Sequence, residues 1–230
     1  MLREINTPNI SLCIQDLFSE AAKHTPEKIA IKFKKDYRWA GISYAALKQT
    51  ALNIASYLQA QGAKKGSHIA LISENCPEWI EVYLGAIYAG MVCVPVDCQL
   101  SALEIENLVA DSQSEFIFCS ENIFSKKINA GFCKRLQKII ILEGDSYKGN
   151  NEIAFSQVKN YSPEGFVQPP INPEDNAELI YTSGTTADPK GVMLTHRNIC
   201  SNFMSIYKLR LCSPSDNFIA LLPLHHTYPF

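Results

Sequence analysis

A chain of 230 residues is long enough to bury a substantial hydrophobic core, as one large domain or two small ones. Apolar residues make up 47% of the chain and charged residues 19%, which excludes an intrinsically disordered protein. The 21 Lys and Arg residues nearly balance the 23 Asp and Glu residues, and no basic stripe is present. We therefore expect no nucleic-acid partner.

Cysteine usage and hydropathy bear on the cellular compartment. None of the eight cysteines forms a C-x-x-C pair, and several lie in apolar runs such as VCVPV and FIFCS. This pattern favours buried free thiols in a reducing compartment, and the N-terminal segment does not resemble a signal peptide. Residues 82–96 are fifteen uncharged residues, short of the roughly 20 that span a bilayer. We therefore expect a cytoplasmic chain without a transmembrane segment.

Short β-rich runs alternate with segments of helical period along the chain. Strands are expected at residues 28–33, 68–73, 92–97, 115–120 and 138–143. Most of these runs are almost continuously apolar, which is typical of strands buried on both faces of a sheet. With helices between the strands, the predicted fold class is α/β, a parallel sheet flanked by helices on both faces.

The predicted helices have recognisable ends. Ser43 is a candidate N-cap for a helix that stops at Gly62, and Pro77 begins a second helix that ends at Gly90. A third helix follows Ser101, where a glutamate three residues later gives a capping-box signature. This pattern places each helix between two predicted strands.

A loop rich in Gly, Pro and Asn at residues 160–175 interrupts this alternation. It suggests a first α/β subdomain at residues 1–170 and the start of a second at residues 171–230, which contains the next motif. The apolar residues 216–224 are expected to form a further strand. An uncovered edge or face on that strand predicts self-association of the chain.

Residues 181–196 read YTSGTTADPKGVMLTH and contain five Ser or Thr residues, two glycines and one lysine. The preceding apolar segment AELI predicts a strand, residues 182–191 a loop, and residues 195–209 a helix with Thr195 as N-cap. A strand, a Gly/Thr-rich loop and a helix form a layout that binds phosphate. The loop is not a Walker A motif, because five residues separate Gly184 from Lys190 and the order is Lys-Gly. A polar surface hairpin is the alternative interpretation.

This string resembles YTSGTTGxPKGV, the phosphate-binding signature of the adenylate-forming (AMP-binding) superfamily. Three other segments resemble family motifs in the same order: ISYAAL at residues 42–47, AIYAGMVCVPVD at 86–97 and LLPLHHTYPF at 221–230. The resemblance covers essentially the whole chain and is to the N-terminal portion of such enzymes. The last segment leans towards acyl-CoA synthetases that handle aliphatic chains, such as fatty-acid–CoA ligases.

The resemblance implies an ATP- and Mg²⁺-dependent ligase that activates a small-molecule carboxylate, expected to be fatty, as an acyl-adenylate and passes it to CoA or a carrier thiol. The catalytic residue it implies is His226, beside the α-phosphate in the carboxylate pocket; an inert strand-end histidine is the alternative. His225 has no assigned role, and Tyr228 is an aromatic wall or a core residue. The residues implied to wrap the β- and γ-phosphates, of which Thr182 would also contact Mg²⁺, are Thr182, Ser183, Gly184, Thr185, Thr186 and Lys190.

Two kinds of departure from the family pattern keep a second interpretation open. Ala187 and Pro229 stand where the family usually has glycine. The resemblance also implies an adenine-binding segment, a Mg²⁺-binding glutamate, a ribose-binding aspartate and a C-terminal domain with a catalytic lysine, none of which matches these 230 residues. The chain is therefore expected to be either the N-terminal portion of an acyl-CoA synthetase-type enzyme or a noncatalytic homologue that binds polyphosphate or is completed by a partner chain.

Overall fold

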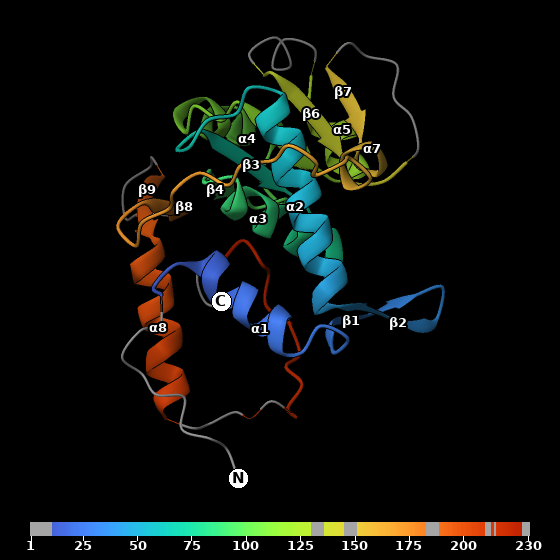
Figure 1. Ribbon diagram of the computed structural model, residues 1–230. Coiled ribbons are helices and arrows are strands. Elements are labelled where there is room, and N and C mark those ends of the chain that lie inside the picture. The colour runs from blue at the N-terminus through green and yellow to red at the C-terminus, as the bar shows by residue number, and fades with distance from the viewer. Residues whose placement is uncertain are drawn as a thin grey trace.

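The computed structural model describes residues 11–129, 136–144, 151–182, 189–209, 213 and 215–226. Its centre is a seven-stranded sheet in the order β7-β6-β5-β3-β4-β8-β9 (Figure 1). The strands of this sheet are β3 (His68–Ile72), β4 (Val92–Pro95), β5 (Phe116–Cys119), β6 (Lys138–Ile141), β7 (Glu152–Ala154), β8 (Asn176–Thr182) and β9 (Lys190–Thr195). The helices are α1 (Ile14–His24), α2 (Tyr44–Ala60), α3 (Pro77–Tyr88), α4 (Ala102–Asp111), α5 (Glu121–Lys127), α7 (Phe155–Lys159) and α8 (His196–Lys208).

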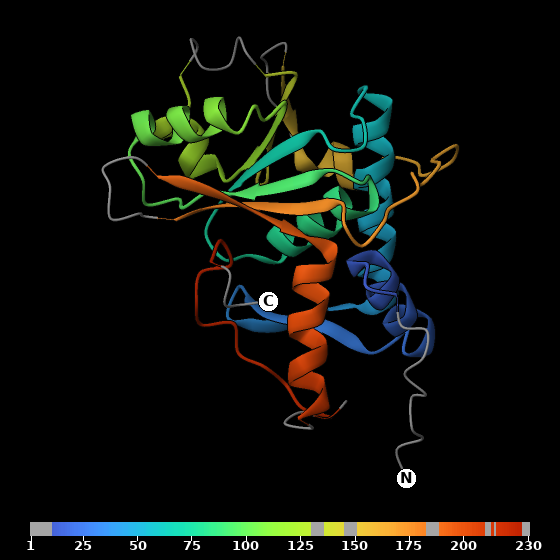
Figure 2. The same cartoon turned by 90° about the vertical axis from the view of Figure 1, so that its left-hand side faces the viewer.

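The strands from β7 to β8 are all parallel, and only β9 runs antiparallel to its neighbour, β8. Helices cover both faces of the sheet: α4 and α5 lie on one side, and α2 and α3 lie on the other (Figure 2). The predicted α/β fold class, with a mostly parallel sheet between helices, is confirmed. The five strands predicted before residue 144 all form, although the first belongs to a separate hairpin.

The alternation of side chains along β3 shows why both faces need a cover. Ile69 and Leu71 pack with α2 and α3, whereas Ala70 and Ile72 pack in the second cluster with α4. All four side chains are fully buried. Because successive residues of a strand point to opposite faces, an uninterrupted apolar run requires two helical layers.

The predicted helix ends are confirmed by their capping bonds and glycines. The Ser43 side chain accepts a hydrogen bond from the Ala46 N–H at the start of α2, and Ser101 begins α4 with a complete capping box. Gly62 and Gly90, which follow α2 and α3, have φ values of 91° and 69°, a conformation that favours glycine. The segment 82–96 forms the end of α3 and then β4, both buried.

The strand predicted at residues 28–33 pairs outside the main sheet. It is β1 (Ile29–Lys35), and it forms a two-stranded antiparallel sheet with β2 (Arg38–Ser43). The turn residues Asp36 and Tyr37 have φ values of 49° and 63°. A type I′ hairpin turn has positive φ at both central residues, and without an Asn-Gly or Asp-Gly pair the sequence did not reveal this hairpin.

The layout predicted around the phosphate loop is wrong in one respect. The helix does not follow the loop directly, because β9 lies between them and contains Lys190 and Gly191, which were expected in the loop. Thr195 does cap α8, with a capping box completed by Asn198. Since Thr195 pairs with Asn176 at the start of β8, the N-terminus of α8 lies at the opposite end of the hairpin from the loop.

The strand predicted at residues 216–224 is also wrong. Its described residues form no strand, and the side chains of Phe218, Ile219 and Leu221 are about four-fifths exposed, at 80%, 79% and 82%. An apolar run becomes a strand only where a sheet offers it a partner and a buried face. Among the described helices, none is long and apolar enough to cross a membrane.

The predicted boundary near residue 170 lies in the connection between α7 and β8. The segments on either side of it contribute strands to the same sheet, since β8 pairs with β4 through Cys93 and Glu178. The division into two subdomains stays a prediction.

Candidate functional site

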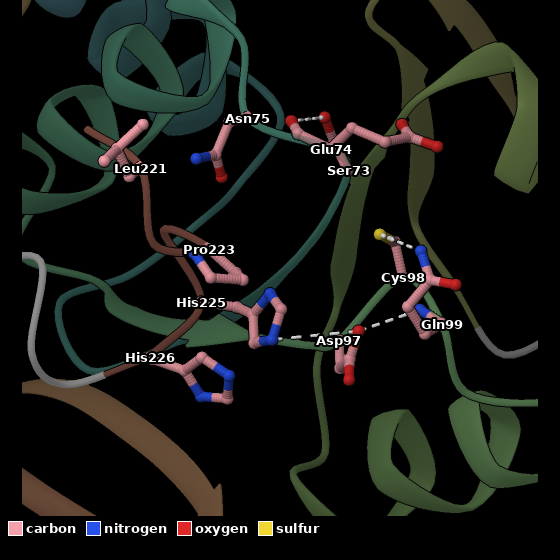
Figure 3. Close-up of a pocket in the computed structure, with 10 residues that line it drawn as sticks. All are labelled: Ser73, Glu74, Asn75, Asp97, Cys98, Gln99, Leu221, Pro223, His225 and His226. Carbon is pink, nitrogen blue, oxygen red and sulfur yellow. Dashed lines mark hydrogen bonds and ion pairs between the residues drawn. The ribbon is translucent and has the colours of Figure 1, made fainter. Parts of the chain in front are cut away.

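A pocket of about 280 Å³ opens where β3 and β4 end (Figure 3). Two of its walls are short segments just past the ends of these strands, residues 73–75 after β3 and 97–99 after β4. The third wall is the segment at residues 221–226, which comes from a distant part of the chain. Ligand sites in open parallel sheets characteristically lie at the carboxyl ends of strands, where the loops converge.

The side-chain amide of Asn75 joins two of these walls. Its Nδ2 donates a hydrogen bond of 2.8 Å to the Leu222 carbonyl oxygen, and its Oδ1 accepts one of 2.8 Å from the Leu224 N–H. Leu224 is buried in the main core cluster. The amide and the buried leucine together tie residues 222–224 to the end of β3.

His225 and His226 follow this tie and line the pocket. The His225 side chain is 9% exposed, and its Nε2 lies 3.7 Å from Asp97 Oδ1, beyond hydrogen-bond distance. Within the described part of the chain, this Nε2 is buried without a hydrogen-bond partner. Burial lowers the pKa of His225, the neighbouring His226 lowers it further, and Asp97 offsets part of the effect. His225 is therefore favoured in its neutral form, with one polar atom unsatisfied at the pocket.

His226, the sequence-predicted catalytic residue, is exposed at the pocket. Its ring centroid lies 4.3 Å from that of His225, and its backbone N–H donates to the Pro223 carbonyl oxygen at 3.2 Å. The backbone hydrogen bond closes a tight turn over residues 223–226, and within this turn the two imidazole rings lie side by side. An exposed imidazole beside a pocket has the chemistry to bind a carboxylate or to move a proton.

Glu74 adds a carboxylate to the pocket wall. Partial burial pushes its pKa upward, but hydrogen bonds from its own backbone, Ser120 and Asn122 outweigh that effect and hold the pKa below the usual value. Asp97 Oδ1 accepts a hydrogen bond of 2.8 Å from the Gln99 N–H (Figure 3). Within the described ranges no three His, Cys, Asp or Glu residues gather closely enough to hold a metal ion.

The two ends of the phosphate loop meet in the β8–β9 hairpin. Thr182 and Lys190 are register partners, and the Thr182 hydroxyl donates to the Lys190 carbonyl oxygen at 3.5 Å. Both residues are exposed, and no carboxylate of the described residues lies within ion-pair distance of Lys190. Just before the loop, the Tyr181 hydroxyl donates to Asp111 Oδ2 at 2.5 Å. The predicted ligands Ser183, Gly184, Thr185 and Thr186, and also Ala187, lie outside the described residues.

The loop and the pocket lie at the same edge of the sheet. Cys93 of β4 and Glu178 of β8 are register partners in parallel strands. Asp97 and Thr182 each come four residues after one member of that pair, so Asp97, just past the end of β4, and Thr182, the last residue of β8, lie at the carboxyl ends of neighbouring strands. Along this edge, Thr182 and Lys190 therefore lie at the end of the β8–β9 hairpin. The pocket residues Glu74, Asp97, His225 and His226 lie beside it, where β3 and β4 end.

Sequence reasoning missed the pocket residues that follow β3 and β4. The sequence carried a signal for them, because SEN follows one apolar run and DCQ follows another. Polar residues directly after buried parallel strands fall at the ligand-binding edge. The long-range hydrogen bonds of Asn75 had no such signal, because nothing in the sequence relates residue 75 to residues 222–224.

Comparison with known proteins relates this chain to a protein family. The family model of the AMP-binding enzymes matches residues 18–230. A long-chain-fatty-acid–CoA ligase of Bacillus subtilis is 28% identical over 253 residues, covering 98% of this chain and 44% of the ligase. A crotonobetaine/carnitine–CoA ligase of Escherichia fergusonii is 29% identical over 189 residues, covering 80% of this chain and 36% of that protein. The chain spans less than half the length of the curated relatives it matches.

The solved structures agree on the fold. A long-chain-fatty-acid–CoA ligase from Archaeoglobus fulgidus superposes with a TM-score of 0.80 at 23% identity, covering 96% of this chain and 44% of that one. A fatty acid AMP ligase from Legionella pneumophila superposes with a TM-score of 0.70 at 26% identity, covering 90% of this chain and 34% of that one. Since the family model covers nearly the whole chain, this protein belongs to the AMP-binding enzyme family.

Proposed function

We propose that this chain contributes the polyphosphate-binding loop and part of the carboxylate pocket of an ATP-dependent acid–thiol ligase. In this reaction a carboxylate oxygen attacks the α-phosphorus of ATP, the bond to pyrophosphate breaks, and an acyl-adenylate forms. A thiol, of CoA or of a carrier protein, then takes the acyl group and releases AMP. The observation that carries the proposal is the position of Lys190 and Thr182 at the same sheet edge as His226.

The available groups fit a polyphosphate. ATP brings about four negative charges, which call for cations, hydroxyl groups and backbone N–H donors at its phosphates. Lys190 supplies an exposed ammonium group, and Thr182 supplies an oxygen suited to a phosphate or to Mg²⁺. Because α8 begins at the far end of the hairpin, its dipole does not contribute to phosphate binding. We propose that Ser183, Gly184, Thr185 and Thr186 provide the remaining donors.

The carboxylate side of the site is assigned to His226. Its exposed imidazole lines the pocket, so it is available to donate a hydrogen bond to a substrate carboxylate and orient the attacking oxygen. Glu74 and Asp97 line the same pocket and would repel a carboxylate placed next to them. We therefore propose that the substrate carboxylate approaches from the His226 side. A fatty acyl chain, as in the name of the Bacillus subtilis relative, is the proposed substrate class.

Isothermal titration calorimetry with pyrophosphate tests the loop assignment. Pyrophosphate would meet one ammonium group and several uncharged donors in the proposed loop, so we expect millimolar-range affinity, about 4 kcal/mol of binding free energy. Lys190→Ala is expected to remove this binding, because it deletes the one ammonium group of the predicted phosphate ligands. The matched control is Lys35→Ala, which removes the same charge from an exposed residue in the separate β1–β2 sheet. Equal pyrophosphate binding by the Lys190 variant and the unmodified chain would sink the assignment.

Carboxylate-dependent exchange between ATP and pyrophosphate distinguishes the ligase from the alternative, a noncatalytic homologue that only binds polyphosphate. We propose acyl-adenylate formation for a complete ligase and expect the 230-residue chain to bind pyrophosphate without exchange. Loss of a single oxyanion donor costs about 10²–10³ in rate. The Mg²⁺-binding glutamate, ribose-binding aspartate and catalytic lysine that the resemblance implies match none of these 230 residues, so we expect no exchange above background from them. Exchange above background from this chain alone would contradict that expectation.

Two further expectations stay predictions. The six cysteines that the structure describes form no disulfide, which is in keeping with the proposed reducing, cytoplasmic environment. The exposed apolar side chains at residues 218–222 favour self-association of the chain. Sedimentation equilibrium at micromolar concentration tests the second expectation, and a monomer of 25.7 kDa would contradict it.

A further inference from the structure

Asn75 stands between two rigid elements at one wall of the pocket. It follows β3 by three residues and precedes α3, which begins at Pro77. Its backbone is therefore fixed at both ends by the core of the sheet. Its side chain faces the segment 222–224, which forms no regular secondary structure of its own. Two hydrogen bonds join the Asn75 side chain to the backbone of this segment.

The chemistry of the contact requires an amide. Nδ2 donates to the Leu222 carbonyl oxygen while Oδ1 accepts from the Leu224 N–H, so one side chain satisfies two backbone groups of opposite polarity. An aspartate at neutral pH has no donor, and an alanine has neither group. The two bonds imitate the pairing of a neighbouring strand and hold the segment in one register.

The register of this segment decides where the histidines lie. Only one peptide separates the Leu224 N–H from His225, and the His226 N–H turns back to the Pro223 carbonyl oxygen. The direction of both imidazoles is therefore set by the backbone that Asn75 holds. Asp97, in the segment that follows β4, faces His225 with its Oδ1 3.7 Å from the His225 Nε2.

We propose that Asn75 is a positioning residue: its amide fixes the backbone of residues 222–224 so that His225 faces Asp97 and His226 faces the substrate pocket. The assignment of His226 to the substrate rests on the proposed function. The amide–backbone clamp itself does not rest on it, and the two are tested separately.

The experiment follows both imidazoles by NMR in the 230-residue chain labelled with ¹⁵N-histidine, together with hydrogen exchange of the Leu224 amide. The variants are Asn75→Ala, which removes both bonds, and Asn75→Asp, which keeps the shape and places a carboxylate against the Leu222 carbonyl oxygen. Asn53→Ala is the matched control. Asn53 also donates its amide to a distant backbone carbonyl, that of Lys159 at 2.7 Å, but it does not line the pocket.

Both Asn75 variants are expected to change the imidazole signals of His225 and His226 and to speed up exchange at Leu224. The midpoint of the His225 titration should move up towards the ordinary 6.5, because burial is the main cause that lowers this pKa in the folded chain. Asn53→Ala should lower stability without changing these signals. If Asn75 contributed only to stability, its two variants would behave like Asn53→Ala, with lower stability and unchanged imidazole signals.

Unchanged imidazole signals and an unchanged His225 titration in folded Asn75→Ala would overturn the proposal. If the Asn75 variants do not fold, the unmodified chain still decides it, because a Leu224 amide that exchanges as fast as that of exposed Ile219 would show that no clamp exists. Measuring pyrophosphate binding of the same variants distinguishes a failure of this proposal from a failure of the proposed function. The Asn75 variants should bind pyrophosphate as the unmodified chain does, so loss of the clamp and failure of the phosphate loop have different signatures.

Discussion

Glu178 gives the sharpest test of the electrostatics beside the proposed site. Its side chain is 1% exposed in the middle of β8, and its Oε1 has no hydrogen-bond partner among the described residues. Burial raises the pKa of Glu178 from 4.5 to about 7. A carboxyl group placed there is neutral in the folded chain at a pH at which it is already ionised in the unfolded chain.

The direction of the pH effect follows from proton uptake on folding. Below pH 4.5 the carboxyl group is protonated in both states and imposes no cost. Between pH 4.5 and about 7 the folded chain holds a proton that the unfolded chain has lost, so the free energy of unfolding falls as the pH rises. Over the whole window the displaced pKa corresponds to about 3 kcal/mol.

Glu178→Gln should abolish this dependence, because the amide does not ionise. Urea unfolding of both proteins at several pH values from about 5 to about 8 gives the difference in free energy of unfolding, and we expect that difference to shift by about 2 to 3 kcal/mol in favour of the variant. Other titrating groups cancel in the comparison, and so does the constant cost of burying the new amide. A difference that stays constant across this range would refute the assigned ionisation of Glu178.

Three further predictions concern the frame that holds the site. Burial lowers the pKa of His196 to about 4, so the folded chain loses stability as the pH falls from 6.5 towards that value, and His196→Gln should remove about 2 kcal/mol of this loss in acid urea titrations. Lys159→Met should cost about 3 kcal/mol at neutral pH, because it leaves the 1% exposed Glu81 carboxylate without its partner at 2.7 Å, and the cost should shrink in acid, where Glu81 is protonated. Gly85→Ala should cost about 1–3 kcal/mol in denaturant unfolding, because the new Cβ would lie 2.5 Å from Ile54 Cγ2 where α2 and α3 touch, and an unchanged midpoint would contradict this contact.

The predictable part of the fold is the part encoded locally. The apolar runs that became β3 to β6 carry their two-sided burial in their own composition, and Ser101 carries its capping box within four residues. The failures depend on partners that are distant in the sequence. Lys190 and Gly191 were assigned to the loop and residues 192–194 to no element, because the pairing with β8 is not visible in the segment itself. Residues 216–224 were predicted as a strand because their own sequence does not show that the sheet offers them no partner strand.

The same division applies to the candidate site. The predicted phosphate loop was named from its own residues; Thr182 and Lys190 pair at its two ends, and phosphate binding by the loop stays a prediction. The pocket was only partly predictable: His226 was identified by resemblance, whereas Asn75, Asp97 and Glu74 reach it through the order of strands in the sheet. Sheet order is a property of the whole fold and has no local signature.

The Asn75 clamp also sets an order of assembly on the ribosome. It joins positions separated by 147 and 149 residues, whereas β3 and β4 pair within one helical crossover. As the nascent chain emerges, the walls that follow β3 and β4 are complete long before residues 222–226 are synthesised. Docking of β8 beside β4 then brings residue 178 next to residue 93 and shortens the loop that remains to be closed, which lowers its entropic cost. The histidine segment thus arrives after the other two walls, at a surface already shaped to receive it, and until then the pocket stands open on the side where the imidazoles will lie.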